Sequence, residues 1–362
     1  MKRSRGRVVE VDSLADFDRR LAAGASDLSG WRCRSLDLRG RGEPLSACEV
    51  AGAMFLGCLL DPGVEADIES RGAIVFPLLP DVPLDPYRGA LYSARELYDG
   101  PDYRASLDAR AYAWSQSDLD HDGLLAATLH DHSVDGALGS WVEGRSLVGV
   151  MGGHALQRDH AGYRRAARLG RLLARRRTVA TGGGPGAMEA ANLGARLAAA
   201  GEDAHERVLA VVASVPHYSP DIGAWARVAL DALAEVEARA ATGETLGIPT
   251  WHYGHEPPNV FASVIAKYVR NAVREAVLLE ACDAGIVFLP GAAGTVQEVF
   301  QDACENYYAD PRSVAPMVLV GRRYWTETLP VWPLLSRLAR DRAMESNVHL
   351  VDDVDEAAEV VG

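Results

Sequence analysis

The residues with the clearest chemical potential lie in one stretch, residues 287–298, which reads Val-Phe-Leu-Pro-Gly-Ala-Ala-Gly-Thr-Val-Gln-Glu. The apolar run 285–289 predicts a buried strand, and a helix is expected to begin near Thr295. Free N–H groups and the helix dipole at such a junction favour an anion. Small residues let a phosphate approach the backbone, and here they are Gly291, Ala292, Ala293 and Gly294. We therefore expect a phosphate site, with the Thr295 hydroxyl as a further donor and Glu298 beside it.

The same residues also allow an interpretation without any ligand. Thr295-x-x-Glu298 has the spacing of a capping box, in which the Glu side chain bonds back to the N–H of the N-cap residue. This motif alone leaves the functional and the capping interpretations equally open.

Composition and charge exclude several classes of protein. The chain has 362 residues, enough for about two domains, and a net charge of −13 argues against a nucleic-acid-binding surface. Met1 to Gly6 leads into no long apolar run, and no stretch approaches the length of a membrane span. We therefore expect no signal peptide and no membrane contact. The five cysteines are odd in number and lack CxxC spacing, so we expect a cytoplasmic protein with reduced thiols. They are Cys33, Cys48, Cys58, Cys282 and Cys304.

The hydrophobic pattern predicts two parts. Residues 1–140 are expected to form a smaller N-terminal α+β unit without regular βα alternation and of unknown role. Residues 141–362 predict an α/β domain, a Rossmann-like doubly wound, mainly parallel sheet, with a long helix over 260–281. Its strand candidates are residues 147–151, 178–181, 207–213, 248–251, 285–289, 316–320 and 349–351.

Ligands in such sheets bind at the carboxyl ends of the strands. This rule brings three loops toward one edge of the sheet: Gly152-Gly153-His154, residues 182–186 and residues 290–295.

Two groups of possible metal ligands have spacings that argue against metal binding. Asp118-x-Asp120-x-Asp122-Gly123 copies the start of an EF-hand loop, but Leu129 stands where that loop needs a Glu. We instead expect an acidic loop before a helix starting near Gly123. Another group contains His130 and His132, which are two residues apart and would point to different faces of a helix; its members are His121, His130, Asp131 and His132.

A dinucleotide site is an alternative for the glycine-rich turn. Gly182-x-Gly184-x-x-Ala187 fits G-x-G-x-x-A, but Ala213-Ser214 end the next predicted strand, where a ribose-binding Asp or Glu is needed. The chain also lacks G-x-x-x-x-G-K-[ST], the phosphate-binding loop of NTPases. We therefore expect no cofactor.

Together, two glycine-rich motifs resemble those of the Lonely Guy (LOG) family, formerly called lysine decarboxylase-like. They are residues 182–190, Gly-Gly-Gly-Pro-Gly-Ala-Met-Glu-Ala, and residues 290–298. Gly152-Gly153-His154 and Pro257-Pro258-Asn259 are similar to its bacterial branch of pyrimidine/purine nucleotide 5′-monophosphate nucleosidases. The resemblance covers roughly residues 145–325 and leaves the first 140 outside.

The resemblance implies hydrolysis of the N-glycosidic bond of a nucleoside 5′-monophosphate, AMP or a related one, to free base and ribose 5-phosphate. In the family the second motif holds the phosphate, and its Glu acts at the ribose with an Arg from the preceding helix. These roles imply Glu298 and Arg274 as catalytic residues, with Arg270, one helical turn earlier on the same predicted face, in reserve. The family also implies a homo-oligomer. Further phosphate or base contacts would be Gly152, Gly153, His154, Gly183, Gly184, Gly186 and Met188.

Two departures from the family pattern keep a second function open. Ala292 stands where the family has its second Gly, and an alanine would be costly there if the position needs a positive φ. The family's Arg position falls on Glu275, one residue after Arg274. The alternative is a non-catalytic nucleotide sensor or carrier on the same fold. A third hypothesis, an NAD-linked oxidoreductase, rests on the weak glycine fingerprint alone.

Overall fold

The computed structural model describes residues 8–252 and 256–362, so Met1 to Gly6, where no leader was expected, lies outside the described residues. The chain divides into two compact units that alternate along the sequence. The first contains the residues up to 90 together with 118–137, and the second contains 91–117 together with 138–362. The predicted boundary at residue 140 falls inside helix α6 (His121–Val142). None of the described helices combines the length and apolarity needed to cross a bilayer.

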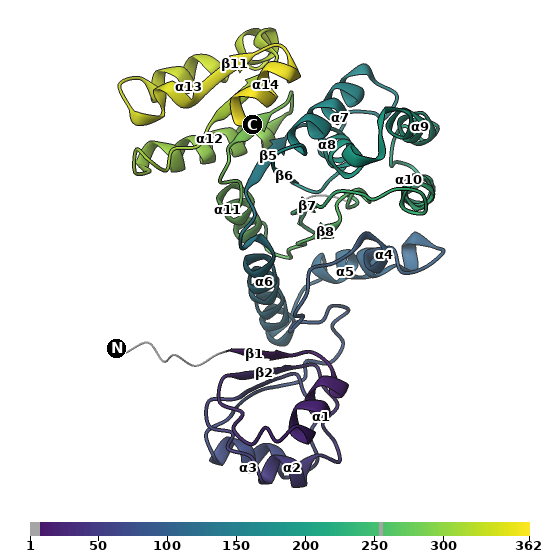
Figure 1. The fold of residues 1–362 in the computed structure, drawn as a ribbon, viewed down its shortest axis with the longest axis vertical. Coiled ribbons are helices and arrows are strands. Elements are labelled where there is room, and N and C mark those ends of the chain that lie inside the picture. Colours follow the sequence, from purple (N-terminus) through teal and green to yellow (C-terminus); the bar gives the residue numbers. More distant parts are fainter. Residues whose placement is uncertain (1–7, 253–255) are drawn as a thin grey trace. The chain divides into compact units, whose positions relative to one another are not determined.

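The first unit is a parallel four-stranded sheet whose strands follow one another in chain order. Three helices alternate with these strands (Figure 1), so the expectation of no regular βα alternation is wrong. The strands are three or four residues long, too short to show a hydrophobic period in the sequence. They are β1 (Val9–Val11), β2 (Trp31–Arg34), β3 (Met54–Leu56) and β4 (Ile74–Phe76), and the helices are α1 (Leu14–Ala22), α2 (Gly42–Ser46) and α3 (Val64–Ser70).

Paired residues on β1 and β2, such as Glu10 and Arg32, and on β2 and β3 are 22 residues apart, and those on β3 and β4 are 20 apart. The isolated bridges Asp27↔Glu49 and Asp37↔Leu59 continue the offset of 22 residues beyond the strands. The unit is therefore a short parallel β/α solenoid, in which each coil stacks on the next.

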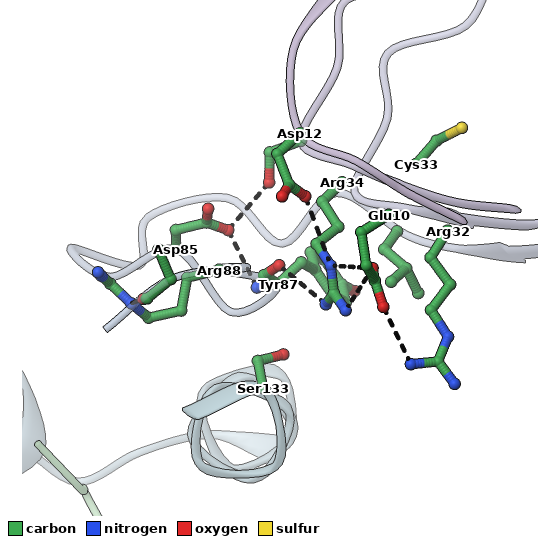
Figure 2. Close-up of polar contacts among 12 residues, drawn as sticks. Glu10, Asp12, Arg32, Cys33, Arg34, Asp85, Tyr87, Arg88 and Ser133 are labelled. Carbon is green, nitrogen blue, oxygen red and sulfur yellow. Dashed lines mark hydrogen bonds and ion pairs between the residues drawn. The ribbon is translucent and has the colours of Figure 1, made fainter. Parts of the chain in front are cut away.

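The two faces of this small sheet differ in polarity. Phe17 and Trp31 meet edge to face on the buried side, with ring centroids 6.1 Å apart, and Cys33 is buried there too. On the other side Glu10 accepts hydrogen bonds from Arg32 (3.3 Å) and Arg34 (3.0 Å), as Figure 2 shows. These cross-strand pairs are exposed, so we expect them to contribute little to stability.

The second unit contains a seven-stranded sheet with the order β11-β10-β9-β5-β6-β7-β8, and every neighbouring pair is parallel. Its chain order reverses direction beside β5, which confirms the predicted doubly wound α/β sheet. The strands are β5 (Leu147–Met151), β6 (Thr178–Thr181), β7 (Thr245–Gly247), β8 (Val264–Ile265), β9 (Ile286–Phe288), β10 (Met317–Val320) and β11 (Val348–Val351).

Helices of the second unit pack in separate groups around this sheet. In one group α7 contacts both α8 and α14, in another α12 contacts α11 and α13, and α9 packs on α10. The segment 91–117 adds α4 and α5. The bounds are α4 (Ala94–Leu97), α5 (Leu107–Ser115), α7 (Ala161–Leu173), α8 (Ala187–Arg196), α9 (Glu202–Val212), α10 (Ile222–Glu237), α11 (Asn271–Glu280), α12 (Ala293–Tyr308), α13 (Trp332–Ala339) and α14 (Val354–Val361).

Three predictions for this unit are wrong. Residues 207–212 belong to helix α9, with Ala213 as its C-cap, and the buried positions Ala204, Val208 and Val212 recur every four residues. The predicted strand at 248–251 lies just beyond the true one, β7. Of the predicted helix 260–281, only Asn271–Glu280 is helical, as α11. The residues before it are not helical, because Ser263 and its neighbours pair with β7.

Candidate functional site

Three loops meet at the carboxyl edge of the larger sheet, as the strand-end rule predicts. They follow β5, β6 and β9, which are adjacent in the sheet. The Gly153 N–H donates to the Pro290 carbonyl (3.1 Å), and the Ala187 N–H donates to the Gly153 carbonyl (3.1 Å). Gly152-Gly153 therefore forms the bridge between the two glycine-rich motifs.

The turn after β6 needs glycine at two positions. Gly183 and Gly186 both have φ of +72°, a conformation that residues with a Cβ rarely adopt. A Cβ on Gly186 would lie 2.5 Å from the Gly153 carbonyl oxygen, and one on Gly184 would lie 3.0 Å from the Met188 methyl carbon. The turn thus exists only because these side chains are absent, and Met188 packs against it.

Asn259 stabilises this turn through hydrogen bonds to its backbone, and the sequence analysis did not predict it as a site residue. It is fully buried, its backbone N–H donates to the Gly183 carbonyl (2.9 Å), and its side chain donates to the Gly184 carbonyl (3.1 Å) and to Asn192 (3.1 Å). The signal was in the sequence, because Asn259 ends the Pro257-Pro258-Asn259 segment.

The loop before α12 is compact at its base and open at its tip. Tyr324 donates its hydroxyl to the Gly291 carbonyl (2.7 Å), and a Cβ on Gly291 would lie 2.1 Å from the Thr295 hydroxyl oxygen. In contrast, the residues at the tip, Ala292, Ala293 and Gly294, are exposed. Because they carry small side chains or none, the N–H groups of the first helical turn are accessible to an anion.

The structure does not support the capping box. Helix α12 begins at Ala293, two residues earlier than expected, so Ala292 is the N-cap residue and Thr295 lies inside the helix. No side chain caps this end. Ala292 has φ of −101°, so the cost expected for a non-glycine residue at positive φ does not arise.

Glu298 and Arg274 lie together beneath this edge. Both are more than nine-tenths buried, and the Arg274 Nη1 atom is 3.6 Å from Glu298 Oε1. Burial raises the pKa of Glu298 to about 7, and the negative charges of Glu275 and Glu256 act in the same direction, against the lowering by Arg274. Glu298 therefore exchanges a proton readily near neutral pH.

Arg274 also makes strong contacts with protein groups. Its Nε–H donates to the Ile248 carbonyl (2.7 Å), its Nη1 to Glu275 (3.0 Å) and its Nη2 to the Gly182 carbonyl (3.4 Å). It thereby ties together the ends of β6 and β7 and orients Glu298. Arg270 does not share a helix face with it, because Arg270 is the exposed N-cap residue of α11.

A second carboxylate, Glu256, lies at this edge and was not predicted. Its Oε1 is 3.2 Å from His154 Nδ1, and its Oε2 lies 3.6 Å from where a Gly184 Cβ would be. His154 is half-exposed here. The one sequence signal that could have predicted Glu256 as a site residue is its position directly before Pro257-Pro258.

The alternative ligands find less support in the geometry. Strand β7, which pairs with β6 in the sheet, runs into Ile248 and Pro249, so no carboxylate stands there for a dinucleotide ribose. In the first unit the acidic loop precedes α6, which begins at His121, two residues before the predicted start, and Asp120 accepts from the Gly123 N–H (2.9 Å). His130 is buried and His132 exposed, so these two histidines do point to different sides. The five cysteines are free.

Comparison with known proteins gives only distant structural likenesses. No protein-family model and no curated protein matches the chain. One similar solved structure is a molybdenum cofactor binding protein from the phototrophic bacterium Rippkaea orientalis, with 17% identity, a TM-score of 0.38, and coverage of 60% of this chain and 95% of that one. Another is the molybdenum cofactor carrier protein from Chlamydomonas reinhardtii, with 17% identity, a TM-score of 0.35, and coverage of 60% and 96%. The sheet order itself places the second unit among doubly wound parallel α/β folds.

Proposed function

We propose that the carboxyl edge of the larger sheet binds a nucleoside 5′-monophosphate and hydrolyses its N-glycosidic bond. The observation that carries this proposal is the buried pair of Glu298 and Arg274, one turn beyond an open helix start made of small residues. The phosphate would accept hydrogen bonds from the first turn of α12. The ribose would then lie over Glu298, with the base toward Gly184 and Met188.

The environment of Glu298 suits this reaction. Cleavage passes through an oxocarbenium-like state at C1′, which a nearby carboxylate stabilises. Water supplies the oxygen that bonds to C1′, and the electrons of the C1′–N bond leave with the base. The proton released by water passes through Glu298 to the nitrogen of the departing base. A carboxyl whose pKa is about 7 can both accept and return that proton at neutral pH.

Binding without cleavage is the second candidate, and one observation favours it. The three nitrogens of Arg274 donate to Ile248, Glu275 and Gly182, so this guanidinium is engaged by the protein rather than aimed at a ligand phosphate. A protein that only carries or senses a nucleotide needs the open helix start and the glycine turn, but no free catalytic Arg.

Product analysis separates these two functions. Purified full-length protein would be incubated with AMP, GMP, CMP, UMP or IMP and the mixtures resolved by chromatography, in parallel with Glu298→Gln. Glu305→Gln is the matched control, because Glu305 is an exposed residue two turns further along α12. Free base from wild type and Glu305→Gln, but not from Glu298→Gln, supports the hydrolase.

Calorimetry with the same nucleotides covers the other outcomes. Binding of any nucleotide with no base released in any tube would replace the hydrolase by the carrier or sensor. Neither binding nor release would overturn both.

A further inference from the structure

Three side chains on helix α9 lie close enough together to share one metal ion. Glu202, His205 and Glu206 each offer one ligand atom, and these atoms all lie within 4.8 Å of one another. Their spacing of three and four residues puts them on one face of the helix. Within residues 8–252 and 256–362, this is the one group of three such side chains with that geometry.

His205 provides a second, independent indication of a ligand. Its side chain is buried, with 3% of the residue exposed, and neither Nδ1 nor Nε2 has a hydrogen-bond partner in the protein. A buried polar atom without a partner costs free energy. An ion bound at one ring nitrogen would remove part of that cost.

The two carboxylates are already oriented by arginines from the neighbouring helix α7. Arg171 donates to Oε2 of Glu202, and Arg164 donates to Oε2 of Glu206. Each carboxylate has a second oxygen, so it can bind a cation through Oε1 while the arginine keeps Oε2. Such outer partners are typical of metal sites, where they fix the orientation of the ligands.

We propose that Glu202, His205 and Glu206 bind a divalent transition-metal ion of the Zn²⁺ class, with Arg164 and Arg171 as outer partners. One imidazole nitrogen and two carboxylate oxygens suit such an ion better than Ca²⁺ or Mg²⁺, which prefer oxygen ligands only. Three protein ligands leave a coordination position for water. The site shares no residue with the sheet edge and is independent of the function proposed there.

Zn²⁺ titration by calorimetry tests this site on metal-free, full-length protein without a histidine tag. We expect one Zn²⁺ per chain, bound at least about tenfold more weakly after Glu202→Gln or Glu206→Gln. Both residues are exposed, so these isosteric variants should keep the fold. The control is Asp203→Asn, an exposed acid on the same helix, which should bind as wild type does.

Cobalt spectroscopy identifies the ligand atoms. Co²⁺ should give visible bands of nitrogen and oxygen ligation, and His205→Gln, checked for folding by circular dichroism, should lose them. A thiolate charge-transfer band would instead place the ion at a cysteine such as the exposed Cys304. That band, the absence of Zn²⁺ binding by wild type, or equal weakening by Asp203→Asn would each overturn the proposal.

Discussion

Glu298 and Asp302 lie one helical turn apart on the buried face of α12. Burial raises the pKa of Glu298 to about 7 and that of Asp302 to about 8. Only Glu298 faces Arg274, whereas one oxygen of Asp302 is buried without a partner. The two carboxyl groups therefore have different consequences, one for the chemistry of the edge and one for stability.

If Glu298 accepts the proton of the attacking water, its ionised form is the active one. We expect the rate of base release to rise as pH increases through about 7 and to level off above it. The check is a pH profile of kcat/KM on a nucleotide from which base release has been detected. A rate that falls across the same range would assign Glu298 the role of acid instead.

Asp302 should make the folded state less stable as pH rises. Its pKa is raised in the folded protein from 3.8 to about 8, so the folded chain retains a proton that the unfolded chain has released. The free energy of unfolding should therefore fall between these two pH values and stay low above them.

Asp302→Asn should flatten this fall and stabilise the protein above pH 8 by on the order of a few kcal/mol. Urea unfolding across the pH range is the measurement, with Asp203→Asn as the exposed control. Curves for Asp302→Asn and wild type that stay parallel at all pH values would contradict the expected protonation of Asp302.

At the scale of elements, the bounds of a strand were predicted most accurately where a buried strand is followed directly by glycine. Residues 147–151 and 178–181 match β5 and β6, because a short apolar run ended by Gly allows little else. Arg207 to Ala213 was misassigned because its valines favour a strand locally, whereas their four-residue burial period reflects packing on neighbouring helices.

The residues of the candidate site that lie in local sequence motifs could be predicted, whereas those brought in by tertiary contacts could not. The two glycine motifs, Glu298 and Arg274 could be selected from the sequence, and the structure brings them to one edge. Glu256 and Asn259 join the edge from residues 256–263, a described stretch that forms neither strand nor helix. No period or motif fixes such a path, which depends on tertiary hydrogen bonds like those from Asn259 to Gly183 and Gly184.

The glycine turn after β6 gives a prediction at this scale. Gly186→Ala should destabilise the protein by at least about 1–2 kcal/mol, the usual cost of a Cβ at positive φ, with more from the 2.5 Å approach to the Gly153 carbonyl. Gly294→Ala is the matched control, because a Cβ there meets nothing within 4 Å and helix α12 should gain roughly 0.5–1 kcal/mol. Chemical denaturation of both variants is the check, and equal stabilities would contradict the strained turn.

At the scale of the whole molecule, the larger unit depends on the segment 91–117. The Asp108 carboxylate, 2% exposed, accepts from Lys267 Nζ (2.6 Å), Trp251 Nε1 (2.9 Å) and the Tyr103 hydroxyl (2.7 Å). The segment also bonds to the edge of the large sheet through Tyr92 and Ile265. The expected homo-oligomer, by contrast, stays a prediction that rests on the family resemblance.

Removing the charge at Asp108 should be costly because it leaves Lys267, 1% exposed, as a buried cation without a counter-ion. We expect Asp108→Asn to lose about 3–5 kcal/mol of stability. Adding Lys267→Met should recover much of that loss, since the amide oxygen introduced by Asp108→Asn could still accept from Trp251. A double-mutant cycle by urea unfolding measures this coupling, and purely additive losses would show that the pair is not the cause.

The same contact has a consequence for synthesis on the ribosome. Asp108 and Lys267 are 159 residues apart, so at ordinary translation rates Asp108 emerges about 8 to 30 s before its partner. The strands of the small solenoid all lie within the first 76 residues and can pair while the chain is still being made. The segment 91–117 must instead wait with its buried face uncovered. This interval is when we would expect a nascent chain to need a chaperone.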